Sequence, residues 1–330
     1  MRLLRLLLLL LGLGVLVALV LEHDPAVVWA SIARLSWRLG VVLLFPVALV
    51  MVLDTLGWRF AFRRHRVPFG VLVATRLAGE AFNIVTPTAA MGGEVVKAWL
   101  LRERAPLDES VPSVIIAKTT ITIAQGLFLL LGVGLAALTL RGSALLAGME
   151  WLLGLEVLAL GVFIVMQTRG LVGWSARMLA RLGVRRLGAS ATVARVDEAL
   201  AEFYARRPGR LALSIAFHLV AWLLGSLEAW LILSFLGVHV SLATATVIEA
   251  FGTGIRFATF LVPASLGAQE GGYVVTFLAL GLGTAEGVSF GLVRRLRELV
   301  WVALGLLVFA VMRHGPVVAA PSTLGNRDPT

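Results

Sequence analysis

The sequence predicts an all-α, polytopic membrane protein, and its composition and patterning both support that fold class. Hydrophobic residues make up 59% of the 330 residues, charged residues only 15%, and the mean hydropathy is +0.94. Soluble domains carry about 25% charged residues, so this composition excludes a soluble fold. The apolar residues also lie in runs long enough to cross a hydrocarbon core, which takes about 20 helical residues. Several membrane-crossing helices are therefore expected.

The first apolar run, residues 1–21, carries Arg2 and Arg5 and resembles a signal peptide as much as a membrane anchor. It ends in the polar residues 22–25 without a small-x-small cleavage site, so we expect a retained helix. Further apolar runs are separated by charged or Pro- and Gly-containing segments. These runs cover residues 39–57, 69–86, 113–140, 150–166, 211–236, 243–262, 271–283 and 298–312.

Two of the separating segments predict broken helices. In the first, the run that contains Asn83 stops at Pro87, and Gly93 and Glu94 open a second limb that reaches only Leu101. That limb is too short to span a bilayer.

The second break has the same form. Pro263 stops a helix, and Gly267 and Glu270 lie where the next helix starts. In both breaks a glutamate follows the proline by seven residues, with glycines between them.

The paired breaks predict an internal repeat, about residues 1–148 and 149–314, within a single transmembrane domain over residues 1–314. If each break is a re-entrant hairpin or a down-and-up pair, over residues 69–101 and 243–283, it returns the chain to the side it came from. About six full crossings then remain, both termini lie in the cytoplasm, and the repeats are inverted. The sequence leaves the choice between re-entrant and fully spanning hairpins open.

Positive charges agree with this orientation, because they collect in cytoplasmic loops. The arginines at 59–66 and the basic segment 168–210 should face the cytoplasm; the latter has nine arginines against three acidic residues. Residues 237–242 contain no Lys or Arg and should face outside. Within the basic segment, a stripe of Arg177, Arg181 and Arg185 suits a helix on an anionic leaflet, and a solvated connector is the alternative. The tail 315–330 is expected to be disordered.

Charged side chains within the apolar runs are the candidate functional residues, because each costs about 2.5–3.5 kcal/mol at the centre of an inserted helix unless it faces protein or water. Near the breaks these residues are Arg76, Glu80, Glu94, Lys97, Arg256, Glu270, Arg294, Arg295 and Glu298. We expect the two breaks to meet and enclose a polar cavity for a lipid headgroup. The alternative is that the charges only pair with one another, or that Glu94 and Glu270 cap helix N-termini, which stabilises by about 0.3–1 kcal/mol.

Several classes of protein find no support in the sequence. It contains no cysteine, no phosphate-binding loop, no H-E-x-x-H metal motif and no plausible Ser/His pair. We therefore expect no enzyme activity, no metal and no cofactor. The net charge of +10 reflects cytoplasmic loops and indicates no nucleic-acid partner.

Residues 82–98, F-N-I-V-T-P-T-A-A-M-G-G-E-V-V-K-A, and residues 261–273, L-V-P-A-S-L-G-A-Q-E-G-G-Y, carry a family resemblance. Together with an arginine-rich start of the last helix, they resemble the transmembrane family of lysylphosphatidylglycerol synthases, also called the flippase-like family. The resemblance covers nearly the whole chain and extends to stand-alone, hopanoid-associated members. The matching site residues are Asn83, Pro87, Gly93, Glu94, Lys97, Pro263, Gly267, Glu270, Gly271, Arg294, Arg295 and Glu298.

The resemblance implies a bacterial inner-membrane protein that moves a polar or anionic lipid between leaflets. It does not imply lysyl transfer, because in the bifunctional members that chemistry belongs to a soluble C-terminal domain. The alternative is a non-transporting scaffold or regulator, whose partners would be lipid-synthesis enzymes. The cargo, the energy source and the formation of homo-oligomers stay open.

Overall fold

The computed structural model describes residue 21 and residues 25–33, 35–86, 92–168 and 191–314. Within these ranges the regular structure is helical and no strand occurs. The helix predicted over residues 1–21, Pro87, the stripe of Arg177, Arg181 and Arg185, and the tail 315–330 lie outside the described residues.

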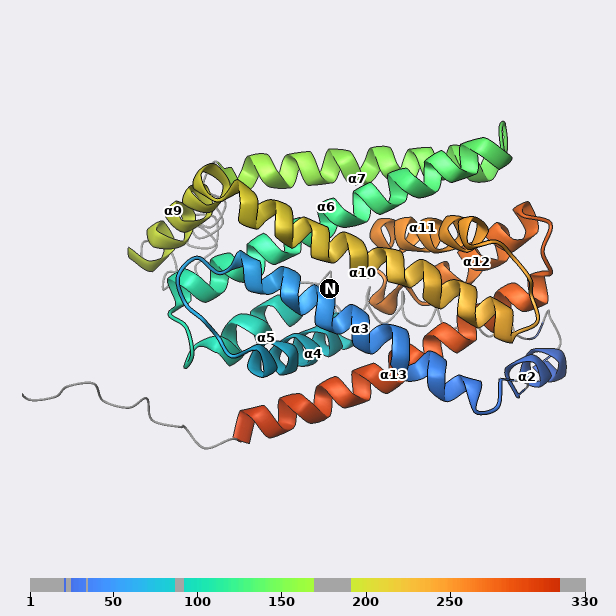
Figure 1. Ribbon diagram of the computed structural model, residues 1–330, viewed down its shortest axis with the longest axis horizontal. Coiled ribbons are helices and arrows are strands. Elements are labelled where there is room, and N and C mark those ends of the chain that lie inside the picture. Colours follow the sequence, from blue (N-terminus) through green and yellow to red (C-terminus); the bar gives the residue numbers. More distant parts are fainter. Residues whose placement is uncertain (1–20, 22–24, 34, 87–91, 169–190, 315–330) are drawn as a thin grey trace, which may run out of the picture.

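Most of the helices correspond to predicted apolar runs (Figure 1). In chain order they are α2 (Pro25–Ala33), α3 (Arg38–Ala61), α4 (Phe69–Val85), α5 (Gly92–Leu101), α6 (Leu107–Thr139), α7 (Ala144–Thr168), α9 (Ala191–Arg206), α10 (Pro208–Phe235), α11 (Leu242–Ala258), the 3-10 turn η2 (Pro263–Ser265), α12 (Ala268–Ala279) and α13 (Thr284–His314). Both predicted helix breaks are present, between α4 and α5 and between α11 and α12.

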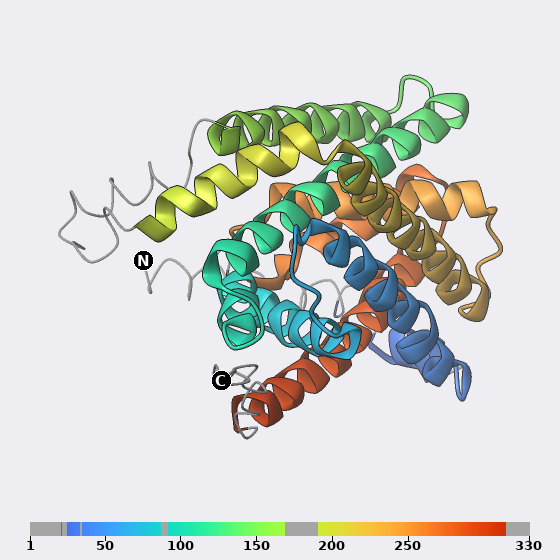
Figure 2. The same ribbon diagram turned by 60° about the vertical axis from the view of Figure 1, so that its left-hand side comes forward.

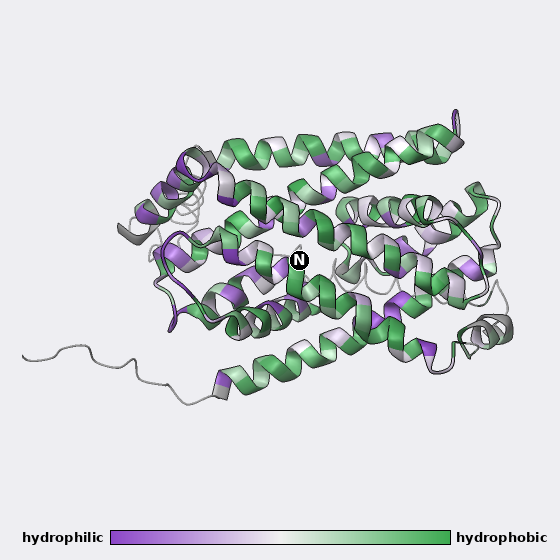
Figure 3. Ribbon diagram, viewed as in Figure 1, coloured by the Kyte–Doolittle hydropathy of each residue, from purple (hydrophilic) through white to green (hydrophobic). Residues whose placement is uncertain are grey.

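Four of the described helices, α3, α6, α7 and α10, are long and apolar enough to cross a membrane. They correspond to the runs predicted over 39–57, 113–140, 150–166 and 211–236. Large apolar side chains such as Phe45, Leu130 and Leu158 are exposed on them, which suits a hydrocarbon surrounding. Figure 3 shows that hydrophobic residues predominate along the long helices.

The prediction for the last helix was wrong in its starting point. We expected it to open at the cluster Arg294, Arg295, Arg297 and Glu298, but α13 begins at Thr284 and carries this cluster in its interior. Hydrocarbon excludes unpaired charges, so the sequence pattern favoured a helix end there. In the folded protein the charges are paired with carboxylates on other helices, which the local sequence does not reveal.

The long helices run side by side along the longest axis of the molecule (Figure 1). The α3–α4 connection, α9 and the C-terminal end of α13 lie at one end, and the α10–α11 connection lies at the other. In the second view, α9 covers its end of the bundle against α6 and α7 (Figure 2). The described parts of the segments predicted to face the cytoplasm, residues 59–66 and 191–210, therefore lie at one end of the fold.

Apolar packing among the described residues is divided into separate clusters. One joins α3, α4 and α6 to α9 through Trp58, Leu72 and Phe203. A second joins α10 to α13 through Leu233 and Phe290, and a third joins α6, α7 and α11. Because Phe203 is fully buried, α9 is part of the folded bundle.

Candidate functional site

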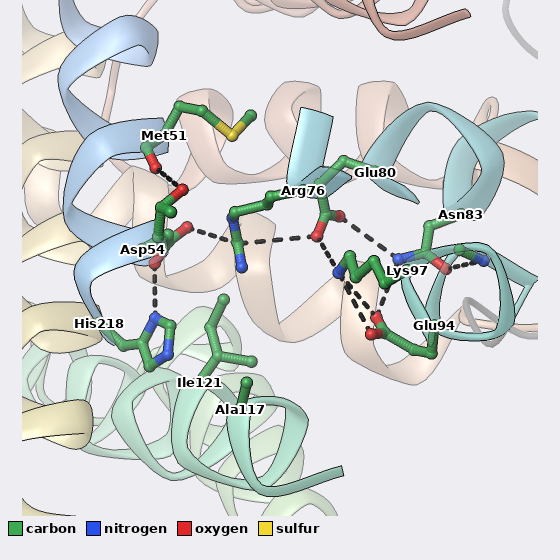
Figure 4. A network of polar contacts seen from close by, with 12 residues as sticks. Met51, Asp54, Arg76, Glu80, Asn83, Glu94, Lys97, Ala117, Ile121 and His218 are labelled. Carbon is green, nitrogen blue, oxygen red and sulfur yellow. Dashed lines mark hydrogen bonds and ion pairs between the residues drawn. The ribbon is translucent and has the colours of Figure 1, made fainter. Parts of the chain in front are cut away.

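The first helix break is surrounded by an ion-pair network on α3, α4 and α5 (Figure 4). Arg76 Nη2 donates to Asp54 Oδ2 at 2.8 Å and lies 3.6 Å from Glu80 Oε1. Lys97 Nζ donates to Glu80 Oε1 at 2.8 Å and to Glu94 Oε1 at 3.1 Å. Two buried cations thus hold three carboxylates, and each carboxylate has a partner.

Asn83 and Gly93 fix the geometry of the break itself. Asn83 Nδ2 donates to Glu94 Oε1 at 3.1 Å, and Asn83 Oδ1 accepts from the Gly93 backbone N–H at 2.8 Å. A Cβ atom on Gly93 would lie 1.9 Å from the Gly79 carbonyl oxygen. Only glycine therefore lets α4 and α5 approach this closely.

We expect Gly93→Ala to destabilise the protein by about 3 kcal/mol or more, because overpacking here must separate two backbones rather than move a flexible side chain. The matched control is Gly70→Ala in α4, where a Cβ would meet no atom within 4 Å. Thermal unfolding in detergent should show a lower Tm for Gly93→Ala only. Equal Tm values for the two variants would contradict the close α4–α5 contact.

The second break has its own network on α11, α12 and α13. Arg295 binds Glu270 and Glu298, with Nη2 2.5 Å from Glu270 Oε1. Arg256 Nη2 donates to Gln269 Oε1 at 2.9 Å, and its Nη1 lies 3.5 Å from Glu298 Oε1. Glu298 thus connects a cation on α11 with one on α13.

Glu270 also caps the helix that follows the break. Its Oε2 accepts from the Gly267 backbone N–H at 2.8 Å, directly before α12 begins at Ala268. Gly267 has φ of 77° and ends a turn in which Ala264 and Ser265 have φ of 53° and 48°. Helix capping and ion pairing, weighed as alternatives from the sequence, both apply to Glu270.

Arg294 is the counter-ion of a glutamate on α11. It forms a two-point pair with Glu249, in which Nη2 lies 2.9 Å from Oε1 and Nη1 binds Oε2. Next to it, Arg297 binds Glu228. Arg294 and Glu249 are buried, so this pair joins α13 to α11 inside the fold.

A cavity of about 250 Å³ lies between the two breaks. Its charged lining residues come from α4, α6, α11 and α13, so both halves of the chain contribute; they are Glu80, Lys118, Arg256 and Glu298. Its uncharged polar lining includes Asn83, Thr122, Gln125 and Ser265. Contact between η2 and α4 brings the breaks together here, as the sequence predicted.

A second group of residues does not line the cavity but supports the lining through the ion pairs described above. These residues are Arg76, Glu94, Lys97, Glu270 and Arg295. Glu80 is 34% exposed and Arg256 is 42% exposed, so both have charge available at the cavity surface. Pro263 lies in η2 at the second break. The predicted site residues therefore fall into a lining set, a supporting set and the separate Arg294 pair.

Lys118 lines the cavity although it is not among the site residues predicted from the sequence. It lies within α6. Its ammonium group acts electrostatically on Glu80, yet among the described residues it forms no direct ion pair or hydrogen bond. The spacing of Lys118, Thr122 and Gln125 places them on one helix face, and that polar stripe was the available signal.

Asp54 and His218, which are not among the predicted site residues either, belong to the network at the first break. Asp54 binds Arg76, and His218 Nδ1 lies 2.7 Å from Asp54 Oδ1. The three residues come from α3, α4 and α10, far apart in the sequence. A single sequence cannot show such long-range partners.

Comparison with known proteins identifies the relatives of this chain. The model of the family described as lysylphosphatidylglycerol synthase TM region matches residues 3–306, which confirms the resemblance. A UPF0104 membrane protein of Methanothermobacter thermautotrophicus is 25% identical over 294 residues, covering 82% of this chain and 84% of the relative. No solved structure matches.

Proposed function

The chain belongs to the lysylphosphatidylglycerol synthase TM-region family, and on that premise we propose that it moves a polar or anionic lipid between the leaflets of a membrane. The observation that carries the proposal is the cavity between the two helix breaks. Charged groups are rare inside membrane proteins, and where they line a cavity they mark pathways for polar substrates. Broken helices that meet at such a site are a recurring plan of transporters.

The charges of the cavity favour a headgroup with a negatively charged phosphate. Lys118 has no direct counter-ion among the described residues, and Arg256 is partly open to the cavity. A phosphate between them would accept charge-assisted hydrogen bonds from both side chains, and such bonds are stronger than hydrogen bonds to a neutral acceptor. At about 30 Å³ per water, the cavity holds the equivalent of about eight water molecules, enough for a phosphodiester group.

The border of the cavity suits the rest of a lipid. Phe260 and Leu261 line it and are 52% and 63% exposed. In a bilayer these side chains would contact hydrocarbon, so acyl chains can stay in the membrane while the headgroup enters the polar interior.

We further propose that the fold is an inverted repeat, with α3 to α6 related to α10 to α13. Helix contacts support this relation. The contact between α4 and α13 corresponds to the contact between α11 and α6. In the same way, the contact between α2 and α13 corresponds to the contact between α7 and α6. In each half, a broken pair, α4–α5 or α11–α12, follows a long helix. Together with α7 and the helix predicted over residues 1–21, this arrangement would give two re-entrant or fully spanning hairpins and about six full crossings.

The proposed location is the bacterial inner membrane with both termini in the cytoplasm. Arginines concentrate in the α3–α4 connection, the α5–α6 connection and the α9–α10 junction at one end, whereas the α10–α11 connection at the other end has no Lys or Arg. That bias assigns the first end to the cytoplasm. Reporter fusions within 168–210 and after Arg313 should report cytoplasmic positions, and a periplasmic signal at either would overturn the topology.

Lipid movement can be tested with the purified protein in liposomes. Labelled anionic, zwitterionic, aminoacylated and hopanoid lipids would be placed in one leaflet, with and without an ion gradient, and their accessibility followed over time. We expect faster exchange of at least one phosphate-bearing lipid than in protein-free liposomes. If every lipid stays in its leaflet and the chain instead copurifies with a lipid-modifying enzyme, the scaffold alternative replaces the proposal.

Neither lysyl transfer nor any cofactor is part of the proposed mechanism. The chain would bind the headgroup, shield it from hydrocarbon and release it on the other side. Among the described residues, no group of His, Cys, Asp and Glu side chains has the arrangement of a metal site.

Glu94 and Glu270 are positioning residues in this proposal, and their replacement tests it. We expect Glu94→Gln and Glu270→Gln each to slow lipid movement and to destabilise the fold by about 1–3 kcal/mol, because Lys97 and Arg295 each lose one carboxylate. Lys97 keeps Glu80, and Arg295 keeps Glu298, so both variants should still fold. Normal lipid movement in both, at normal expression, would show that these carboxylates are purely structural.

A further inference from the structure

A second cavity, strongly basic, lies at the end of the bundle that carries α9. It measures about 530 Å³ and is bounded by the end of α3, the α3–α4 connection and the start of α10. It shares no lining residue with the cavity between the breaks. Its basic lining residues are Arg59, Arg63, Arg64, His65, Arg66 and Arg210.

Part of this positive charge is already used within the protein. Arg63 pairs with Glu109 and Glu202. Glu109 also accepts the Arg64 backbone N–H at 2.8 Å and lies 3.9 Å from the His65 ring nitrogen. The acidic groups next to the cavity are therefore engaged.

The remaining arginines are not neutralised. Arg59, Arg64 and Arg66 have exposed side chains, and among the described residues none of the three forms an ion pair. Arg210 donates through Nε to the Phe60 carbonyl at 3.0 Å and through Nη2 to the Arg59 carbonyl at 3.3 Å. These bonds hold its guanidinium at the cavity without cancelling its charge.

Part of the cavity lining is apolar and aromatic. Phe60 and Phe217 stack with ring centroids 5.6 Å apart, and Arg210 lies 5.7 Å from the centre of the Phe60 ring. These rings stand on α3 and α10, two of the helices apolar enough to cross a membrane. The cavity thus presents guanidinium groups beside a surface that continues into the hydrocarbon region.

We propose that this basic cavity binds the headgroup of an anionic phospholipid from the adjacent leaflet, at a site separate from the cavity between the breaks. Arg59, Arg64 and Arg66 bind the phosphate, since guanidinium groups match phosphate oxygens in two-point geometry. The glycerol and first acyl carbons lie along Phe60 and Phe217. Clusters of basic residues next to membrane helices attract anionic lipids in general, and the aromatic wall selects a lipid over a soluble anion.

The site requires only that the chain lies in a membrane, so its test is independent of lipid movement. Native mass spectrometry of the full chain in detergent would measure binding of dioleoylphosphatidylglycerol, with dioleoylphosphatidylcholine and inorganic phosphate as comparison probes. All measurements would use a Lys118→Gln background, which weakens binding in the other cavity. The pocket variant is Arg59→Gln/Arg64→Gln/Arg66→Gln; the control, Arg102→Gln/Arg104→Gln/Arg141→Gln, removes the same charge elsewhere.

We expect the pocket variant to weaken phosphatidylglycerol binding by about tenfold or more and the control variant by less than about twofold. Phosphatidylcholine should bind more weakly than phosphatidylglycerol, and inorganic phosphate should not compete at matched concentration. Unchanged binding in the pocket variant, or equal losses in both variants, would overturn the site. Competition by phosphate alone would show a soluble-anion site instead. Because the three arginines are exposed, thermal unfolding should confirm an intact fold in each variant.

Discussion

Replacing Lys118 with glutamine should slow lipid movement by about tenfold or more while leaving the helical fold intact. Hydrogen bonds to charged groups contribute about 1.5–3 kcal/mol, and in this proposal the ammonium group of Lys118 is reserved for the headgroup phosphate. No described residue would lose an ion-pair partner, so stability should not fall. The measurement is the leaflet-exchange rate in liposomes, together with the Tm.

Two controls separate this effect from a general loss of charge. Lys118→Arg keeps the positive charge and should retain most of the activity. Arg141→Gln removes a charge from the α6–α7 connection, away from the cavity, and should leave the exchange rate unchanged. An unimpaired Lys118→Gln variant would remove Lys118 from the site. A strong loss of Tm would instead assign it a structural role.

The pair between Arg294 and Glu249 should give the largest single effect on stability. Glu249→Leu is expected to destabilise the fold by about 3–5 kcal/mol, because it leaves a buried guanidinium without its two-point partner. The double variant Glu249→Leu/Arg294→Met should recover most of that loss, since apolar side chains of similar size often replace a buried pair at little cost. Thermal unfolding of the wild type, both single variants and the double variant completes the cycle.

The same set of variants decides what Arg294 does. If the pair serves only to join α11 and α13, the double variant should still move lipid at close to the wild-type rate. A stable double variant without lipid movement would contradict this structural assignment and return Arg294 to the headgroup site predicted from the sequence.

The fold tolerates the charged groups in and around the cavity because carboxylates and cations occur there in equal number. Seven carboxylates face seven cations: Asp54, Glu80, Glu94, Glu228, Glu249, Glu270 and Glu298 against Arg76, Lys97, Lys118, Arg256, Arg294, Arg295 and Arg297. The formal charges of these groups cancel. The ion pairs are distributed unevenly among the cations. Arg295 binds two carboxylates, whereas Lys118 has no direct partner among the described residues.

Local signals made the helix breaks predictable. Proline lacks a backbone donor and glycine permits close approach or positive φ, so Pro263, Gly93 and Gly267 mark the breaks without knowledge of the rest of the fold. The second limb was predicted to open at the glycines before Glu94 and to reach Leu101, and α5 runs from Gly92 to Leu101.

Partners from distant helices were not predictable. The start of α13 was misplaced because Glu228, Glu249 and Glu270, which neutralise its arginines, lie on three other helices. Lys118 was not predicted as a site residue, because a lone lysine in an apolar run resembles a residue that reaches to the membrane surface. Only the cavity, which joins α4, α6, α11 and α13, reveals its position.

The central claim is that a lipid headgroup enters the cavity between the two helix breaks, and photolabelling tests it most directly. A phospholipid with a diazirine on its headgroup would be activated in liposomes that contain the protein, and labelled residues would be mapped by mass spectrometry. We predict labels on cavity residues such as Thr122, Gln125 and Phe260, and a marked decrease of these labels in Lys118→Gln. Labels confined to the connections at the two ends of the bundle, with none in the cavity, would contradict the account.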